Sequence, residues 1–235
     1  MFDSYPNQMV LVRHGESELN HARVSGPIFF ETKEDRFPFV GVADHKIELT
    51  TQGERQSLST GVALAKMNLD LDFVYDSGYV RTVKTLDNLL EGFSEEKKKT
   101  IKRKQNLLIR ERESGYTYFM TKSEVEESFP WYEEYWSTLG PVLARPIGGE
   151  SIADLIVRIR MFLDQTFKET AGKNILISCH GRVLSAMRYL LEDWTFADLE
   201  HFLSSKGPRN CGVTIYSFSP ESNRLCLKEY DTCYW

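Results

Sequence analysis

Short apolar runs that end abruptly at polar residues dominate the pattern of this chain. Residues 9–12 form one such run, which stops at Arg13 and His14, and residues 174–179 form a second, which stops at His180. Uninterrupted apolar runs of this length are typical of strands that are buried on both faces of a sheet. We therefore predict two buried strands, each with a histidine at its carboxyl end.

Further strands are expected at residues 71–75 and 106–109, because both are short apolar runs followed by polar clusters. Near the end of the chain, residues 212–218 and 224–230 alternate between apolar and polar positions around a Ser-Pro-Glu-Ser-Asn turn. This pattern predicts an antiparallel hairpin at the edge of the sheet.

Apolar residues at helical spacing predict helices over 51–67, 151–170 and 183–191. Thr51 and Glu54 have the spacing of a capping box at the start of the first of these helices. A further helix carries Arg81, which is expected one turn after a cap formed by Asp76 and Ser77.

Three segments lack a clear hydrophobic period. Residues 21–43 are expected to form a flap over the strand ends, and the aromatic segment 116–149 to form a second cap of short helices. The charge run at 94–105 has no interleaved aromatic residues, so we expect a solvated helix end and loop there.

The composition limits the possible partners. The 235 residues suit one domain, and no run of eighteen apolar residues exists to span a bilayer. The net charge of −5 disfavours nucleic acid as a partner. The four cysteines show no Cys-x-x-Cys spacing and the first residues do not resemble a secretory signal, so we expect reduced thiols and a cytoplasmic protein.

Polar residues at the strand ends suggest the chemistry. If the strand ends converge, then Arg13, His14, Arg81, His180 and a glutamate near 111 share one pocket. Two guanidinium groups and two imidazoles match a phosphate, whereas arginines beside the histidines would repel a metal ion. A neutral imidazole can also attack phosphorus while a glutamate protonates the leaving group. We therefore expect a phosphate site without metal or other cofactor.

Four sequence blocks carry a resemblance to a known family. They are Leu11–Asn20 with its Arg-His-Gly motif, Ser77-x-x-x-Arg81-x-x-x-Thr85, Glu111-x-x-x-Gly115 and His180-Gly181. In this order the chain resembles the histidine phosphatase superfamily, in its phosphoglycerate mutase-like branch. The resemblance implies an α/β fold of three layers, with a mixed, mostly parallel sheet and helices on both faces. The domain would span residues 1–235, with cap insertions at about 21–43 and 116–149.

The resemblance also implies a role for each site residue. His14 would be the phosphorylated nucleophile, and Glu111 the proton donor, with Glu113 as the alternative. The phosphate would be bound by the remaining site residues: Arg13, Arg81, His180, Gly181, Asn20 and Ser17. Arg112, Arg145 and Glu16 could reach this pocket, but we interpret them as structural.

Two activities fit this resemblance, and a third function belongs to another class. Family mutases have a basic segment after Glu-Arg-His-Tyr-Gly, whereas this chain continues from Glu111-Arg112-Glu113-Ser114-Gly115 into aromatic and acidic sequence. We therefore favour hydrolysis of a small phosphorylated metabolite through a phosphohistidine. Mutase-type phosphoryl transfer and a non-catalytic phosphate-binding module are the alternatives. The sequence does not specify the natural substrate or the oligomeric state.

Overall fold

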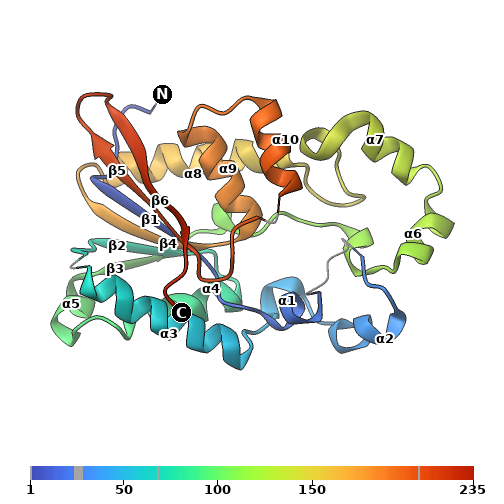
Figure 1. Cartoon of the computed structure of the whole chain (residues 1–235), viewed down its shortest axis with the longest axis horizontal. Helices are drawn as coiled ribbons and strands as arrows, with labels where there is room; N and C mark the ends of the chain where they lie inside the picture. The colour runs from blue at the N-terminus through green and yellow to red at the C-terminus, as the bar shows by residue number, and fades with distance from the viewer. Residues whose placement is uncertain (1, 24–28, 68, 206) are drawn as a thin grey trace.

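A six-stranded sheet forms the centre of the molecule (Figure 1). The computed structural model describes residues 2–23, 29–67, 69–205 and 207–235. The strand order is β3-β2-β4-β1-β5-β6; the first four strands are parallel, and β5 and β6 each pair antiparallel to their neighbour. The strands are β1 (Gln8–Arg13), β2 (Phe73–Asp76), β3 (Lys102–Gln105), β4 (Asn174–Cys179), β5 (Val213–Ser219) and β6 (Arg224–Thr232). The predicted mixed sheet and its edge hairpin are confirmed.

Helices cover both faces of this sheet, as the resemblance implied (Figure 1). Helices α8 (Ile152–Glu169) and α9 (Gly181–Leu191) pack on one face, and α3 (Thr51–Lys66) and α4 (Val80–Leu90) on the other. Alternate residues of β1 face opposite cores: Met9 and Leu11 lie in one and Val10 and Val12 in the other. An additional helix, α10 (Phe196–Ser204), was not predicted.

The two insertions form one lobe beside the ends of the parallel strands (Figure 1). The first and its flanking residues contribute α1 (Glu18–Ala22), α2 (Lys33–Arg36), η1 (Phe37–Phe39) and η2 (Asp44–Lys46). The second contributes η4 (Tyr116–Phe119), α6 (Lys122–Ser128) and α7 (Tyr132–Leu143). The backbone N–H of Phe30 donates to the carbonyl of Met120 at 3.1 Å, and Phe30 lies in a small apolar core with Leu19 and Phe39. Residues 24–28 of the predicted flap lie outside the described residues.

The third predicted strand, at residues 106–109, is wrong. The strand lies within the preceding charge run, at Lys102–Gln105, after the short helix α5 (Glu95–Thr100), while Leu107–Ile109 form the 3₁₀ turn η3. An edge strand needs only one neighbour for its backbone hydrogen bonds and can leave its charged side chains in solvent. Ile109 instead packs in the core on the α8 side.

Two predicted helix caps are also wrong. Thr50, not Thr51, caps α3, because its hydroxyl accepts a hydrogen bond from the N–H of Gly53 at 3.0 Å. Helix α4 begins after Tyr79, so Arg81 is its second residue and not one turn inside it. Asp76 ends β2, and the side chains of Asp76 and Ser77 accept from the N–H groups of Gly78 and Tyr79 in the turn before this helix. Among the described residues, no helix combines the length and apolar character needed to cross a bilayer.

Candidate active site

His14 follows β1 and is buried at the carboxyl end of the sheet. Its backbone N–H donates to the carbonyl of Cys179 at 2.9 Å, which fixes it against the end of β4. The ring Nδ1 lies 2.8 Å from the carbonyl oxygen of Gly15. Because a carbonyl can only accept, Nδ1 carries the proton, and in the neutral ring Nε2 keeps its lone pair. Nε2 is therefore the nucleophilic atom of this imidazole.

The surroundings keep this imidazole neutral. Burial lowers the pKa of His14 well below its usual range, and the positive charges of Arg81 and Arg13 lower it further. The hydrogen bond to Gly15 opposes this shift but does not reverse it. His14 is thus an unprotonated, positioned base or nucleophile near neutral pH.

Gly15 is required here for close packing rather than for an unusual turn. A Cβ at this position would lie 2.4 Å from the carbonyl oxygen of Gly53, at the start of α3. The N–H of Gly15 donates to the hydroxyl of Thr85 at 2.9 Å. The loop after β1 is therefore held between α3 and α4.

His180 lies directly beside His14, with 5.3 Å between the ring centroids. It follows β4 and is fully buried next to His14, which lines the cavity. Its Nε2 is 2.8 Å from the hydroxyl of Ser77, while its Nδ1 is buried without a hydrogen-bond partner in the described part of the chain. Burial, followed by Arg81 and His14, holds the pKa of His180 well below its usual range.

Two arginines complete the centre of the site. The Nη1 of Arg13 donates to the carbonyl of Pro208, while its Nε is buried and has no partner among the described residues. Arg81 donates from Nη1 to the backbone oxygen of Asp44 at 2.7 Å and from Nη2 to its carboxylate at 3.1 Å. Asp44 therefore fixes one edge of this guanidinium.

Ser17 and Asn20 lie on the first turn of α1. Ser17 caps this helix, and the side-chain oxygen of Asn20 accepts from the backbone N–H of Ser17 at 3.3 Å. The amide of Asn210 donates to the same Asn20 oxygen and to the carbonyl of His14, both at 3.0 Å. With its oxygen occupied by two donors, Asn20 keeps its NH₂ group free to donate.

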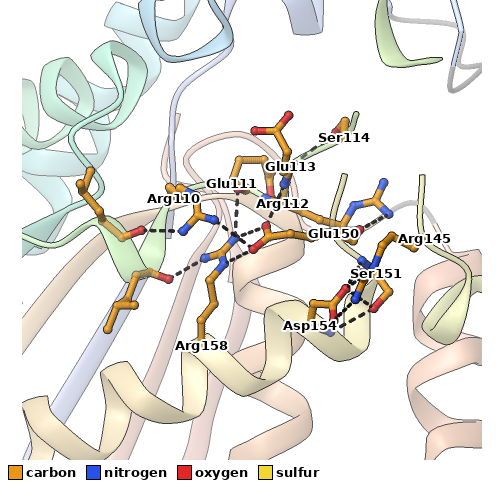
Figure 2. Close-up of polar contacts among 12 residues, drawn as sticks. Arg110, Glu111, Arg112, Glu113, Ser114, Arg145, Glu150, Ser151, Asp154 and Arg158 are labelled. Carbon is orange, nitrogen blue, oxygen red and sulfur yellow. Dashed lines mark hydrogen bonds and ion pairs between the residues drawn. The ribbon is translucent and has the colours of Figure 1, made fainter. Parts of the chain in front are cut away.

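A partly buried ion pair supports the loop that carries Glu111, as Figure 2 shows. The carboxylate of Glu150 accepts from Nε of Arg158 at 2.8 Å and from the backbone N–H of Glu113 at 2.9 Å. Arg158 also donates to the carbonyl of Glu111 at 3.0 Å. Burial alone would raise the pKa of Glu150, but the hydrogen bonds from Arg158 and Glu113 lower it overall. The loop backbone is thus fixed at several points.

The structure separates the two candidate acids. Glu111 lines the cavity, and its carboxylate accepts from the N–H of Arg112 at 2.8 Å. Glu113 is exposed and does not line it. Gly181 begins α9 beside Arg13, where a Cβ would be 3.7 Å from the Nε of Arg13.

A cavity of about 350 Å³ joins these side chains. Its wall includes the predicted residues Arg13, His14, Ser17, Asn20, Arg81 and Glu111. It also includes residues that the sequence analysis left without a function: Arg23, Asp44, Arg112, Tyr118 and Arg182.

The only sequence signal for these additional residues is that some of them lie close to predicted site residues. Arg23 follows Asn20 by three positions at the end of α1, and Arg182 follows Gly181 directly. Arg112, interpreted above as structural, reaches the cavity. Arg145 pairs with Asp154, and so it is structural as expected.

Comparisons with known proteins agree with this geometry. The phosphoglycerate mutase of Cytophaga hutchinsonii, described as 2,3-bisphosphoglycerate-dependent, is 28% identical over 220 residues, covering 90% of this chain and 87% of that protein. The phosphoglycerate mutase-like protein AT74H of Arabidopsis thaliana is 26% identical over 215 residues, covering 83% and 69%.

Solved structures share the fold. Bacillus stearothermophilus YhfR matches with a TM-score of 0.73 at 21% identity, covering 97% of this chain and 98% of that one. A mycobacterial glucosyl-3-phosphoglycerate phosphatase, solved with inorganic phosphate, matches with a TM-score of 0.67 at 20% identity and covers 97% and 98%. The family model for the histidine phosphatase superfamily (branch 1) matches residues 9–229. The chain therefore belongs to the histidine phosphatase superfamily.

Proposed function

We propose that this protein hydrolyses phosphomonoesters of small metabolites through a phosphohistidine formed on His14. One observation carries the proposal: the Nδ1 of His14 is bound to the carbonyl of Gly15, which leaves the Nε2 lone pair available in the wall of an arginine-lined cavity. The lowered pKa of His14 supports the same role.

In the first step, Nε2 of His14 attacks the phosphorus and the bond from phosphorus to the ester oxygen breaks. Glu111 gives its proton to the departing oxygen. Arg13 and Arg81 stabilise the negative charge on the phosphoryl oxygens, with the NH₂ group of Asn20 as a further donor.

In the second step, the Glu111 carboxylate takes a proton from water as the water oxygen attacks phosphorus. The bond between phosphorus and Nε2 breaks, and its electron pair returns to His14. Orthophosphate leaves, and Glu111 is again protonated for the next cycle.

His180 has a supporting role in both steps. Its Nε2 lies 2.8 Å from the hydroxyl of Ser77, and its Nδ1 has no protein partner in the described residues. In the proposal, Nδ1 donates to a phosphoryl oxygen in the form of the ring that carries a proton on this atom. Ser17 and the N–H of Gly181, at helix N-termini, add donors to the same group.

Rapid-quench labelling tests this mechanism. A ³²P-labelled phosphomonoester should give a base-stable, acid-labile label on the wild-type chain and none on a His14→Ala variant. Label that persists in the variant would place the nucleophile elsewhere. Binding of phosphate without any turnover of p-nitrophenyl phosphate would instead favour a non-catalytic binding module.

Mutase-type phosphoryl transfer is the second candidate. It is supported by the relatives named as phosphoglycerate mutases and by the additional arginines in the cavity wall. A single-turnover experiment that starts from the phosphorylated protein distinguishes hydrolysis from mutase-type transfer. Rapid phosphate release in water alone supports hydrolysis, whereas slow hydrolysis with rapid transfer to 3-phosphoglycerate supports the mutase.

We also propose a cytoplasmic location. The four cysteines are free thiols, which supports a reducing compartment. A small phosphorylated molecule is the proposed partner.

A further inference from the structure

Two buried hydroxyl groups connect His180 to the first turn of α4. The Nε2 of His180 lies 2.8 Å from the hydroxyl of Ser77, which lies 2.8 Å from the hydroxyl of Thr82. The Thr82 hydroxyl is also 2.9 Å from the carbonyl oxygen of Tyr79, and the backbone N–H of Tyr79 donates to the Ser77 oxygen at 3.3 Å. His180, Ser77 and Thr82 are fully buried, so each hydroxyl of this chain needs a protein partner.

The carbonyl of Tyr79 sets the direction of these hydrogen bonds. A carbonyl can only accept, so the Thr82 hydroxyl donates its single hydrogen to it. Thr82 must then accept from Ser77, and this contact uses the single hydrogen of Ser77. Ser77 is left with acceptor capacity alone, so the Nε2 of His180 donates to it. Each contact of the chain then contains one hydrogen.

The reverse direction leaves two oxygen atoms in contact without a hydrogen. If Ser77 donated to Nε2, Thr82 would have to donate to Ser77, and its oxygen would face the carbonyl oxygen of Tyr79 at 2.9 Å with no hydrogen between them. Two backbone N–H groups also donate to this carbonyl, but they supply no hydrogen to its contact with the Thr82 hydroxyl. A lone-pair contact of this length between buried oxygens is unfavourable, so the chain runs from His180 toward Tyr79.

His180 therefore carries its proton on Nε2 when the ring is neutral. Its Nδ1 then holds a lone pair and has no partner among the described residues. The charged and titratable groups that face this ring come from the end of β1, the turn before α4, α4 and α8: Arg13, His14, Tyr79, Arg81 and Arg158. Burial, followed by Arg81 and His14, holds the pKa of His180 well below its usual range. Without an anion nearby, Nδ1 is thus an acceptor near neutral pH.

A phosphoryl dianion cannot supply the hydrogen that Nδ1 lacks. Its oxygens only accept, so their lone pairs would meet the lone pair of Nδ1. A proton between the two atoms removes this repulsion, and the negative charge of the anion favours the imidazolium form of the ring. Solvent provides the proton when a dianion binds, whereas a monoanion brings it on one of its own oxygens.

We propose that Ser77 and Thr82 are positioning residues that keep the proton of neutral His180 on Nε2, so that a phosphoryl dianion binds together with one proton from solvent. The inference rests on the proposed function and adds the proton balance of binding to its phosphoryl site. The added proton is held between Nδ1 and a phosphoryl oxygen. It is separate from the proton that Glu111 gives to the leaving group.

Histidine ¹⁵N chemical shifts test the hydroxyl chain directly. In wild-type protein labelled with ¹⁵N-histidine, at about pH 8, the signals of His180 should show a proton on Nε2 and none on Nδ1. Saturation with inorganic phosphate should protonate both nitrogens. The signals of His180 are assigned by their absence from a His180→Gln variant. A proton on Nδ1 before phosphate is added would overturn the inference.

Calorimetry counts the proton that accompanies the anion. Titration with inorganic phosphate at about pH 8, in buffers that differ in ionisation enthalpy, should show uptake of about one proton per bound phosphate. A Glu111→Gln variant should keep this uptake, which separates His180 from the proposed acid. Loss of the uptake in that variant, or its absence in the wild type, would contradict the role of His180.

Variants of Thr82 test the positioning role. Thr82→Val removes the acceptor of the Ser77 hydroxyl, which can then donate to Nε2. The form of His180 with its proton on Nδ1 should become populated, and the proton uptake should fall toward zero. Thr82→Ser keeps the hydroxyl and should behave like the wild type. The matched control is Thr170→Val, because Thr170 has a buried hydroxyl that donates to the carbonyl of Thr166 outside the cavity. It should change neither measurement.

The outcomes distinguish this inference from the proposed hydrolysis. Phosphate binding with proton uptake but without turnover would support the inference and contradict hydrolysis, whereas hydrolysis without proton uptake would do the reverse. If phosphate does not bind, the proposed function and the proton uptake both fail. The ¹⁵N spectra of the phosphate-free wild type and of Thr82→Val still decide then whether Ser77 and Thr82 position the proton of His180. The wild-type spectrum needs no variant, so it remains decisive where a substitution impairs folding.

Discussion

The side-chain amide of Asn210 donates to the side-chain oxygen of Asn20 across 3.0 Å, joining positions 190 residues apart. This contact decides which end of the Asn20 amide is free. Since the oxygen also accepts from Ser17, the NH₂ group is the end that can donate to a phosphoryl oxygen. Asn210 is therefore a positioning residue for Asn20.

Replacing Asn210 with Leu should lower kcat/KM for p-nitrophenyl phosphate about ten-fold, because Asn20 loses the donor that fixes its amide. Asn210→Gln, which keeps a donor on a longer side chain, should recover part of the activity. Steady-state kinetics with a thermal-melt control measure both. Wild-type kinetics in the leucine variant would show that Asn210 does not position Asn20.

Glu111→Gln should slow transfer from glycerol 3-phosphate by on the order of 100-fold, since an alkoxide leaving group needs a proton. The first step with p-nitrophenyl phosphate should slow much less, because p-nitrophenolate leaves without protonation. Glu113→Gln is the matched control and should behave like wild type, as Glu113 is exposed outside the cavity. Single-turnover phosphorylation rates report the step directly. The opposite ranking of the two variants would assign the acid to Glu113.

Folding stability should decrease in mildly acidic solution because of the two site histidines. Burial and Arg81 hold the pKa of both His14 and His180 well below 6.5, the usual value. Below about pH 6.5 the unfolded chain binds protons that the folded chain excludes. The stabilisation is therefore complete above that pH and is lost as the pH falls, by about 1.4 kcal/mol per unit for each histidine. Urea unfolding measures it.

A His14→Gln/His180→Gln variant supplies the comparison for that pH dependence. Its free energy of unfolding should fall less steeply with decreasing pH than that of the wild type. Equal slopes in the two proteins would mean that other groups cause the acid sensitivity.

Glu150→Gln should destabilise the fold by about 2–3 kcal/mol, because it leaves the buried guanidinium of Arg158 without a counter-charge. It should also lower kcat, since the same network holds the loop of Glu111 (Figure 2). The control is Arg145→Ala, which removes the solvent-exposed pair with Asp154 and should cost less than about 1 kcal/mol. Denaturant unfolding compares the two variants. Equal losses in the free energy of unfolding would show that the Glu150–Arg158 pair stabilises the fold no more than the exposed pair does.

Local patterns predicted much of the fold. The runs at 9–12 and 174–179 identify central strands because burial on both faces leaves only apolar residues there. The edge strand Lys102–Gln105 was not predicted, because its backbone pairs with β2 while its charged side chains stay in solvent and leave no apolar run in the sequence. The cap of α3 was also mispredicted, because the neighbouring threonines at positions 50 and 51 offer the same hydroxyl group and only packing selects Thr50.

The sequence by itself determined the central strands, the long helices and the chemical identity of the groups at the strand ends, because burial period and residue type are local properties. Only the tertiary structure decided which groups share one cavity. It placed Glu111 in the wall and Glu113 outside, and it brought Arg23 and Arg182 together from separate insertions and helices. Contacts of this kind depend on the register of the sheet and the packing of the caps, and no local pattern encodes them.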